Sequence, residues 1–594
     1  MQQGQDYNIK NSPGLSEKKY KVLGLLIILF ALLIRLFDLG DRVFHHDESV
    51  HASFTLKLLE TGQYRYDPAY HGPFLFHSTA AVFHFLGIND TTARLVPVFF
   101  GVAAVLLLFL LKKELGERGV LWSAFLLAFS PSMVYFSRFF RNDLIIVFCT
   151  MATFIGGIRY LENLHSSKRY PYLILAASSL AIAVSSKENA YLIILMFGAY
   201  TGVYALYRFY SDWKKENLSL KRTLFLKIST ITPFLPEVLL SVTLFIFIVM
   251  LFYTSLFRIP ESLFSIVERA FSHWMEMHRI ERIGGPFYFY IPILLVYESP
   301  ILIFGTAGIV HFLKKRGENF TFFLFLSYWA VASLLLYSYL QEKVPWLVVH
   351  IVLPFGILAG AYLGDFFSRA SDRRQENLPE QENLLEIEGI ISEKDKKPAF
   401  RIKRSETHTL IAGILVLTLI VFLTQCISIN FYRSMEHDEL MTYSQASPDL
   451  RKLIEKIEKF NQGPENLRIS IADSENLYWP LPWYFRDYEK AAYHKEPPVN
   501  KEYDAIIVPA TCRMYDKVPK KTYASYNFSL RPGKEFTLYY NKKLENSEEN
   551  GEAENSEEKE KLKEKGEAKR KGRLGSRLKF ELSRKGRLKS ESSL

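Results

Sequence analysis

An acidic pair follows the first long apolar stretch of the chain. The stretch covers about residues 22–39, and Asp47-Glu48 comes after it with His45 and His46 directly in front. Charge at a membrane surface is costly, so carboxylates there commonly belong to a functional site. A carboxylate beside histidines and apolar walls can serve as a general base. We therefore predict that Asp47 and Glu48 are catalytic.

The same segment allows two other interpretations. An acidic pair also suits the N-cap and first turn of a helix, where it stabilises the helix dipole. Alternatively, an aspartate and a histidine four residues apart lie on one helix face and could hold a divalent metal. The candidate metal ligands are His46, Asp47 and His51. A divalent metal is the one candidate cofactor.

Cations recur beside acidic groups at three later positions. They are Arg141 with Asp143, Lys187 with Glu188, and Lys343 with Glu342. Such pairs can be simple interfacial anchors or satisfied ion pairs. Their segments, however, fall on the side of the membrane that carries few basic residues, and arginines there are better explained by an anionic ligand such as phosphate. Convergence of the cations suits a lipid-linked phosphate held at the membrane surface.

Asp143 completes the predicted catalytic set. It could share a substrate hydroxyl or a metal with Asp47, or it could pair with Arg141. The predicted substrate-binding residues are His71, Arg138, Arg141, Lys187, Lys343 and Trp346.

Repeated apolar stretches must position these residues, and each is long enough to cross a bilayer core of roughly 30 Å. We predict a polytopic α-helical membrane protein with about 11 spans. They lie at residues 22–39, 94–111, 119–137, 143–161, 170–186, 189–208, 234–256, 288–312, 320–340, 344–366 and 408–430. Alternate loops are basic, which predicts a cytoplasmic N-terminus. The protein is therefore expected in the cell membrane, with its active site on the extracytoplasmic face.

The first outer loop, residues 40–93, predicts two helices that lie in the membrane interface. Val50, Phe54 and Leu58 form an apolar stripe at helical spacing within residues 47–60. Residues 74–86 predict the second helix, with aromatic side chains for the lipid. Residues 261–279 predict a further interfacial helix of the same kind.

Four regions are expected along the chain. They are a cytoplasmic N-terminus (1–21), a transmembrane domain (22–430), a small extracytoplasmic α/β domain (431–542) and a disordered charged tail (543–594). In the α/β domain a helix at 447–460 precedes strands at 468–473, 503–509 and 536–540. The loop 370–397 is predicted to be disordered, because it is acidic and poor in aromatic residues. Residues 478–487 are rich in aromatics and proline, which predicts either a structural loop core or a stacking platform for a sugar.

The composition argues against several classes of protein. The net charge is +11, but no basic run is interleaved with aromatics as in a nucleic-acid-binding patch. The three cysteines are far apart and predict neither a disulfide framework nor a thiolate metal site. The absence of a P-loop motif and of an evident inverted repeat argues against an autonomous pump.

In these motifs the chain resembles the GT-C membrane glycosyltransferases, which include the protein O-mannosyltransferases and the lipid A aminoarabinose transferases. Asp47-Glu48 is similar to the acidic motif of their first outer loop. Lys343-Val-Pro-Trp346, followed by Pro354, is similar to their Lys-x-Pro-aromatic segment. The closer resemblance covers about residues 20–540 and is to an archaeal family described as flippase-activity-associated. Its motifs are similar to His45-His46-Asp47-Glu48, to Tyr-Arg-Tyr-Asp-Pro-Ala-Tyr-His-Gly-Pro at 64–73, and to the aromatic cluster at 479–486.

The resemblance implies a glycosyltransferase that uses a polyprenyl (dolichyl-type) phosphate sugar in glycan or glycoprotein assembly. Asp47 would deprotonate an acceptor hydroxyl on a protein, lipid or glycan, and the hydroxyl would invert the anomeric carbon. Some of Arg138, Arg141, Lys187 and Lys343 would hold the phosphate, while Glu48 and His71 would orient the acceptor or a metal. The expected partners are this donor, the acceptor and membrane lipid, with no nucleic acid. The alternative is a non-catalytic flippase-associated helper or transporter for lipid-linked sugars.

Overall fold

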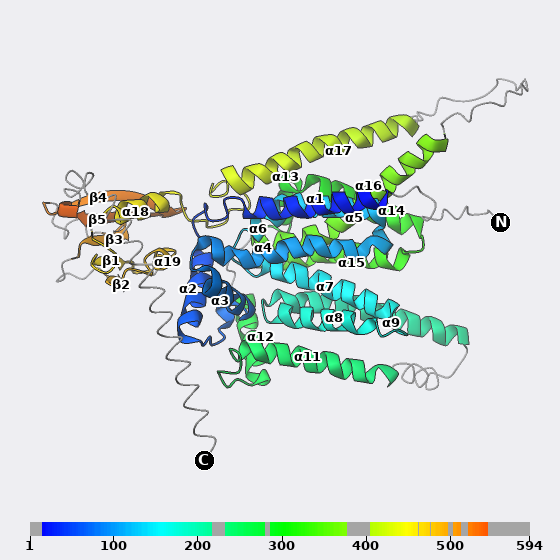
Figure 1. The fold of residues 1–594 in the computed structure, drawn as a ribbon, viewed down its shortest axis with the longest axis horizontal. Coiled ribbons are helices and arrows are strands. Elements are labelled where there is room, and N and C mark those ends of the chain that lie inside the picture. Colours follow the sequence, from blue (N-terminus) through cyan, green and yellow to red (C-terminus); the bar gives the residue numbers. More distant parts are fainter. Residues whose placement is uncertain are drawn as a thin grey trace, which may run out of the picture. The chain divides into compact units, whose positions relative to one another are not determined.

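Long apolar helices dominate the computed structural model (Figure 1), which describes residues 15–216, 232–279, 285–376 and 404–544 except 461, 476, 497–502 and 513–520. Within this part of the chain, seven helices are long and apolar enough to cross a membrane. A pair bent by 106°, Tyr290–Tyr297 with Ser299–Lys315, would make an eighth span. The predicted polytopic α-helical fold is thereby confirmed.

The main helices of this bundle are α1 (Glu17–Leu36), α4 (Asp90–Leu107), α5 (Lys112–Phe129), α6 (Pro131–Ser137), α7 (Asp143–Glu162), α8 (Arg169–Val184), α9 (Asn189–Glu216), α11 (Leu235–Tyr253), α13 (Tyr290–Tyr297), α14 (Ser299–Lys315), α15 (Phe320–Tyr339), α16 (Val348–Glu376) and α17 (Arg404–Ile427). The predicted count of about 11 spans would be reached if α1 and the shorter α8 also cross. It further requires that the run Asp90–Phe129 is two crossings that meet near Gly116, whose φ is 70°. The count stays a prediction.

Helix α16 is the most deeply packed of the candidate spans described, with 94% of its apolar window buried. Gly356, Gly360 and Gly364 recur along it at every fourth position. A Cβ on Gly360 would lie 2.2 Å from the backbone nitrogen of Ser123 in α5, so the two backbones touch. Small residues at this spacing let membrane helices approach closely. This packing fixes the beginning of α16, which follows the short 3-10 helix Pro345–Leu347 that carries Trp346.

Two shorter helices lie across one end of the bundle (Figure 1). They are α2 (His46–Thr61) and α3 (Phe74–Leu86), and Leu58, Tyr64 and Phe76 pack together in this loop. Gly62 ends α2 with a φ of 71°, which a residue without a Cβ adopts freely. Both helices form where the sequence predicts them, and their position in the membrane interface stays a prediction.

Helix α12 (Leu263–Arg279) also forms close to its predicted range. Phe264, Val267 and Phe271 are exposed along one side, while Ile266 and Ala270 are buried on the other. A line of exposed apolar residues on a short helix is typical of an interfacial helix.

The chain divides into two compact units between Ala446 and Ser447. The second unit contains helix α18 (Asp449–Glu458) and a five-stranded sheet of order β2-β1-β3-β5-β4. The strands are β1 (Ile469–Ala472), β2 (Ala491–His494), β3 (Ala505–Pro509), β4 (Tyr523–Arg531) and β5 (Lys534–Asn541). Strand β1 runs parallel to β2 and β3, and β5 runs antiparallel to β3 and β4. The small α/β domain is thus observed, although the sequence missed β2 and β4.

Two details of the domain expectations change. Residues 431–446, predicted to open the outer domain, belong to the first unit, where Gln445 donates to the carbonyl of Val43 at 2.8 Å. Trp483 of the aromatic cluster is fully buried beneath Arg486, whose guanidinium lies 4.2 Å from the ring centre. For Trp483 the structural interpretation therefore holds. Most of the predicted disordered loop and nearly all of the tail lie outside the described residues.

Candidate active site

Helix α2 begins with a capping box that includes the carboxylate of Glu48 but not the carboxylate of Asp47. The Nδ1 atom of His45 accepts a hydrogen bond from the backbone of Asp47 at 3.0 Å, and Glu48 accepts one from the backbone of His45 at 3.0 Å. The Nε2 atom of His45 lies 2.7 Å from the carbonyl of Tyr443 and donates to it. Burial lowers the pKa of His45 to about 3, so the ring is neutral, as these contacts require. The segment therefore caps the helix, with His45 as the N-cap residue and the acidic pair in the first turn.

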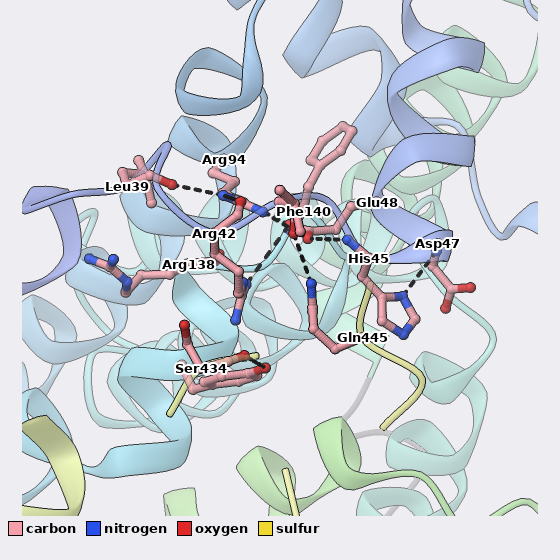
Figure 2. A network of polar contacts seen from close by, with 12 residues as sticks. Leu39, Arg42, His45, Asp47, Glu48, Arg94, Arg138, Phe140, Ser434 and Gln445 are labelled. Carbon is pink, nitrogen blue, oxygen red and sulfur yellow. Dashed lines mark hydrogen bonds and ion pairs between the residues drawn. The ribbon is translucent and has the colours of Figure 1, made fainter. Parts of the chain in front are cut away.

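Glu48 lies at the centre of a buried network (Figure 2). Arg94 binds it with two hydrogen bonds, from Nε at 2.8 Å and Nη2 at 2.9 Å, and the backbone of Phe140 donates to it at 2.8 Å. Burial acts to raise the pKa of Glu48, but Arg94 and Arg42 outweigh it and hold that pKa at about 2. The carboxylate is fully buried and engaged on both oxygens, so it cannot touch a substrate. The predicted catalytic role of Glu48 is corrected to a structural one.

Arg138 also serves the scaffold instead of a phosphate. Its guanidinium donates to backbone carbonyls at the end of α1, including those of Ile34 at 3.1 Å and Asp38 at 3.0 Å. Its own carbonyl accepts a hydrogen bond from Arg42 at 2.6 Å. These contacts join the end of α1 to the segment that leads into Arg141.

Asp47 points away from this network and stays partly open (Figure 2). Its carboxylate forms an ion pair with Arg141, which is itself buried. The guanidinium of Arg141 lies over the ring of Trp346, 3.9 Å from its centre. A cation on an indole face is stabilised electrostatically. Arg141 is thus held between a carboxylate at its edge and an aromatic ring at its face.

Asp143 is buried at the start of α7 and is surrounded by basic side chains. Lys187 contacts it at 2.8 Å, the Nε atom of Arg141 lies 3.6 Å away and the Nε2 atom of His350 lies 3.7 Å away. Lys187 also lies 6.0 Å from the centre of the Trp346 ring. The structure therefore brings Asp47, Arg141, Asp143, Lys187 and Trp346 together, as the sequence predicted.

His71 takes a strained backbone conformation beside them, with φ 68° and ψ −171°. This region is occupied almost only by glycine and costs another residue about 1–3 kcal/mol, so the surroundings must enforce it. Gly72 is flush against the end of α8: its nitrogen donates to Ser186 at 3.0 Å, and a Cβ would lie 2.3 Å from the carbonyl oxygen of Ser185. Such strain is typical of functional sites.

An open pocket with about 910 Å³ of empty space adjoins this cluster. Its polar lining includes His71, Arg141, Lys187, Glu188, His273, Glu342 and Trp346, and its apolar lining includes Leu192, Leu340 and Leu347. Among the described residues that line the pocket, Lys343 is not included. Its ammonium group donates to the carbonyl of Leu340 at 2.8 Å. Of the four predicted phosphate ligands, Arg141 and Lys187 line the pocket, whereas Arg138 and Lys343 donate to backbone carbonyls and do not line it.

The candidate metal ligands are not brought together. Among the described residues, no group of three or more His, Cys, Asp or Glu side chains is arranged to hold a metal. His51 is buried, its Nδ1 atom lies 3.3 Å from the carbonyl of Phe140, and burial lowers its pKa to about 3. His46 and Asp47 therefore gain no third ligand from it.

Sequence reasoning missed Arg42 and Arg94, which hold Glu48 in place. Arg94 stands at the beginning of a predicted span, and a charge there needs a buried partner. That partner, Glu48, is 46 residues away along the chain. The signal for a buried charge was therefore present in the sequence, but the pairing was not.

Comparison with known proteins supports the predicted class. A family model described as dolichyl-phosphate-mannose-protein mannosyltransferase matches residues 45–259, which include Asp47, His71, Arg141 and Lys187. No curated protein sequence matches the chain at a significant level.

Solved structures of one protein, ArnT, share the fold at low sequence identity, and a third structure is less similar. ArnT from Cupriavidus metallidurans in the apo state is 14% identical with a TM-score of 0.53, and the alignment covers 88% of this chain and 98% of that one. The same protein bound to undecaprenyl phosphate is 14% identical with a TM-score of 0.52, and the alignment covers the same shares of the two chains. The oligosaccharyltransferase AglB from Archaeoglobus fulgidus is 13% identical with a TM-score of 0.49, over 86% of this chain and 73% of that one.

The closer resemblance to the archaeal flippase-associated family stays a prediction. The mannosyltransferase family model matches residues 45–259, and the ArnT structures share the fold. The chain is therefore a multi-pass membrane protein with the GT-C glycosyltransferase fold.

Proposed function

We propose that the protein transfers a sugar from a polyprenyl-phosphate donor to an acceptor hydroxyl on the extracytoplasmic face of the membrane. The observation that carries the proposal is the pocket in which Arg141 and Lys187 flank Trp346 next to Asp47. The family model matches residues 45–259, which include Asp47, Arg141 and Lys187 but not Trp346, and it supports this class of reaction. The alternation of basic loops supports the outer location of the pocket.

In this proposal the donor phosphate binds Arg141 and Lys187. Charge-assisted contacts from guanidinium and ammonium groups are the usual means of holding a phosphate. The lipid chain would leave the pocket past Leu192, Leu340 and Leu347, which are the apolar part of its lining. ArnT, which shares the fold, has been solved bound to undecaprenyl phosphate, and this supports a lipid phosphate as the ligand of the present chain.

Both cations are already paired with carboxylates, Arg141 with Asp47 and Lys187 with Asp143. A donor phosphate must therefore compete with these carboxylates for the cations. When Arg141 turns to the phosphate, the carboxylate of Asp47 is released to accept a proton. Asp143 remains with Lys187 and positions it, so we assign Asp143 to positioning and not to contact with the substrate.

The reaction step then follows from the arrangement. The acceptor hydroxyl oxygen attacks the anomeric carbon from the face opposite the phosphate, and its proton passes to Asp47. The bond between the anomeric carbon and the phosphate oxygen breaks with inversion, and polyprenyl phosphate leaves with both electrons of that bond. No strong general acid is needed, because Arg141 and Lys187 stabilise the departing charge.

Purified protein in vesicles tests the proposal. We expect that it releases polyprenyl phosphate from a polyprenyl-phosphate sugar and glycosylates a hydroxyl acceptor added outside. Release and transfer should rise together with protein concentration. Accelerated movement of the lipid-linked sugar across the bilayer without any transfer would overturn the proposal and favour the helper or transporter alternative.

The donor site gives a second expected result. Arg141→Ala should weaken binding of polyprenyl phosphate roughly 10- to 100-fold, because a charge-assisted contact is worth about 1.5–3 kcal/mol. Lys343→Ala removes a cation that lies outside the pocket lining and should change this affinity less than threefold. Titration of both variants with fluorescent polyprenyl phosphate measures the difference. Equal losses in the two variants would contradict the assignment.

A further inference from the structure

His71 lies between a carboxylate and a guanidinium. Its Nδ1 atom is 2.8 Å from the carboxylate of Glu188, and its Nε2 atom is 3.4 Å from the Nη2 atom of Arg141. Glu188 comes from the junction of α8 and α9, whereas His71 comes from the first outer loop. These contacts are distinct from the pair between Arg141 and Asp47.

The chemistry of the two neighbours determines where the imidazole proton lies. A guanidinium can only donate hydrogen bonds, so the Nε2 atom of His71 must present a lone pair to Arg141. Burial acts against ionisation of Glu188, but the adjacent His71 outweighs it and leaves the pKa of Glu188 below its ordinary value. The ionised carboxylate can only accept. Both contacts are satisfied by one form of the ring, the neutral tautomer protonated on Nδ1.

The backbone is built to keep this arrangement. The amides of Gly72 and Phe74 donate to the carbonyls of Ser186 and Ser185 at 3.0 and 2.9 Å. These bonds tie the segment after His71 to the turn that carries Glu188. A Cβ on Gly72 would clash with the backbone of Ser185, so the two segments can lie in contact only because this residue is glycine. The strained conformation of His71 is therefore maintained where it brings its ring onto Glu188.

We propose that Glu188 is a positioning residue that fixes His71 in the Nδ1-protonated tautomer, so that the Nε2 lone pair of His71 aims Arg141 at the donor phosphate. Before the donor binds, Asp47 and His71 contact the edges of the guanidinium and Trp346 its face. Once Arg141 turns from Asp47 to the phosphate, His71 and Trp346 keep it oriented. The role in donor binding rests on the function proposed above, whereas the tautomer does not depend on it.

Glu188→Met is the decisive substitution, because it keeps the approximate length of the side chain and removes the acceptor that faces Nδ1. Glu188→Gln is the matched control, since its amide oxygen can still accept from Nδ1–H. Without an acceptor at Nδ1, the ring proton is free to move to Nε2. Two donors, Nε2–H and Arg141, would then face each other. A histidine in the wrong tautomer disables the group that depends on it, even where the geometry is unchanged.

The tautomer can be measured by nitrogen NMR of protein labelled with ¹⁵N-histidine in vesicles, with the His71 signals identified by their loss in His71→Gln. We expect a protonated Nδ1 and an unprotonated Nε2 in the wild type and in Glu188→Gln, and a signal from rings protonated on Nε2 in Glu188→Met. Glu342→Gln removes a carboxylate from the same pocket lining and should leave the His71 signals unchanged. A wild-type ring protonated on Nε2, or a tautomer that is unchanged in Glu188→Met, would overturn the proposal.

Binding and transfer complete the test. Glu188→Met should reduce kcat/KM and polyprenyl-phosphate affinity roughly 10- to 100-fold, as the loss of orienting partners of histidine does in metal sites, and Glu188→Gln should lose less because it keeps an acceptor. In the His71→Gln background, Glu188→Met should add less than a twofold loss, because its target is gone. Independent losses that multiply would contradict the positioning role. A wild-type protein without transfer would end the proposed function, while the NMR result would still decide the tautomer.

Discussion

Asp47→Asn protein is expected to bind polyprenyl phosphate and to transfer sugar at least about 100-fold more slowly than the wild type, within the usual range for a general base. An amide cannot take the proton of the acceptor hydroxyl. Asp47→Glu should lose a similar factor, because one extra methylene displaces a carboxylate that the first turn of α2 fixes in place. Initial rates of sugar transfer in vesicles, at saturating donor, measure both variants.

Folding provides the control for this result. Asp47 accepts no backbone hydrogen bond of the capping box, which His45 and Glu48 form without it. Loss of its charge near the helix N-terminus should cost only about 0.3–1 kcal/mol, and Arg141 keeps a second carboxylate, Asp143, 3.6 Å from its Nε atom. A thermal unfolding curve within a few degrees of the wild type is therefore expected. Wild-type transfer rates in folded Asp47→Asn protein would remove Asp47 as the base.

Glu48→Gln, one residue further, is expected to act on stability instead of chemistry. It leaves the fully buried Arg94 without its counter-charge, and removing one partner of a buried ion pair costs about 3–5 kcal/mol. Denaturation of the protein in detergent, followed by near-ultraviolet circular dichroism, should show the loss. Arg94→Gln should cost a comparable amount, and the double variant should cost clearly less than the sum. Strict additivity would show that the two residues do not act as a pair.

The pH dependence of stability carries the same information. The pKa of Glu48 is lowered from an ordinary value of 4.5 to about 2 in the folded protein. Its contribution is therefore complete above about 4.5 and is lost as the pH falls toward 2. Glu48→Gln should flatten this part of the acid unfolding curve. An unchanged curve would indicate that Glu48 is not ionised in the native state.

Much of the scaffold follows from local sequence pattern. The apolar stretches, the stripe of Val50, Phe54 and Leu58, and the Gly62 stop predict their helices because hydropathy and helix period are local properties. Gathering of Asp47, Arg141, Lys187 and Trp346 was also foreseen, since the loop charges placed their segments on one face. That inference needed only topology.

The separate roles of the residues within the site could not be predicted from local pattern. Asp47 and Glu48 are neighbours of similar chemistry, yet Asp47 stays partly open and pairs with Arg141, whereas Glu48 is enclosed by Arg94 and the backbone of Phe140. Which carboxylate is enclosed depends on contacts 46 and 92 residues away along the chain. Lys343 illustrates the same limit, because a turn of backbone directs it to Leu340 while its neighbour Glu342 lines the pocket.

The glycine row of α16 has a consequence for the order in which the protein matures. The α5 surface against which it packs is synthesised long before it, since Ser123 and its contact Ile357 are 234 residues apart. At about 5–20 residues per second, ribosomes need roughly ten to fifty seconds to span that interval. During this time the α5 surface that α16 will cover can contact only lipid, the insertion machinery or earlier helices. Trp346 is synthesised just before α16, so the pocket it lines is completed late in synthesis. A chain released early would contain the acidic motif without the ring on which Arg141 lies.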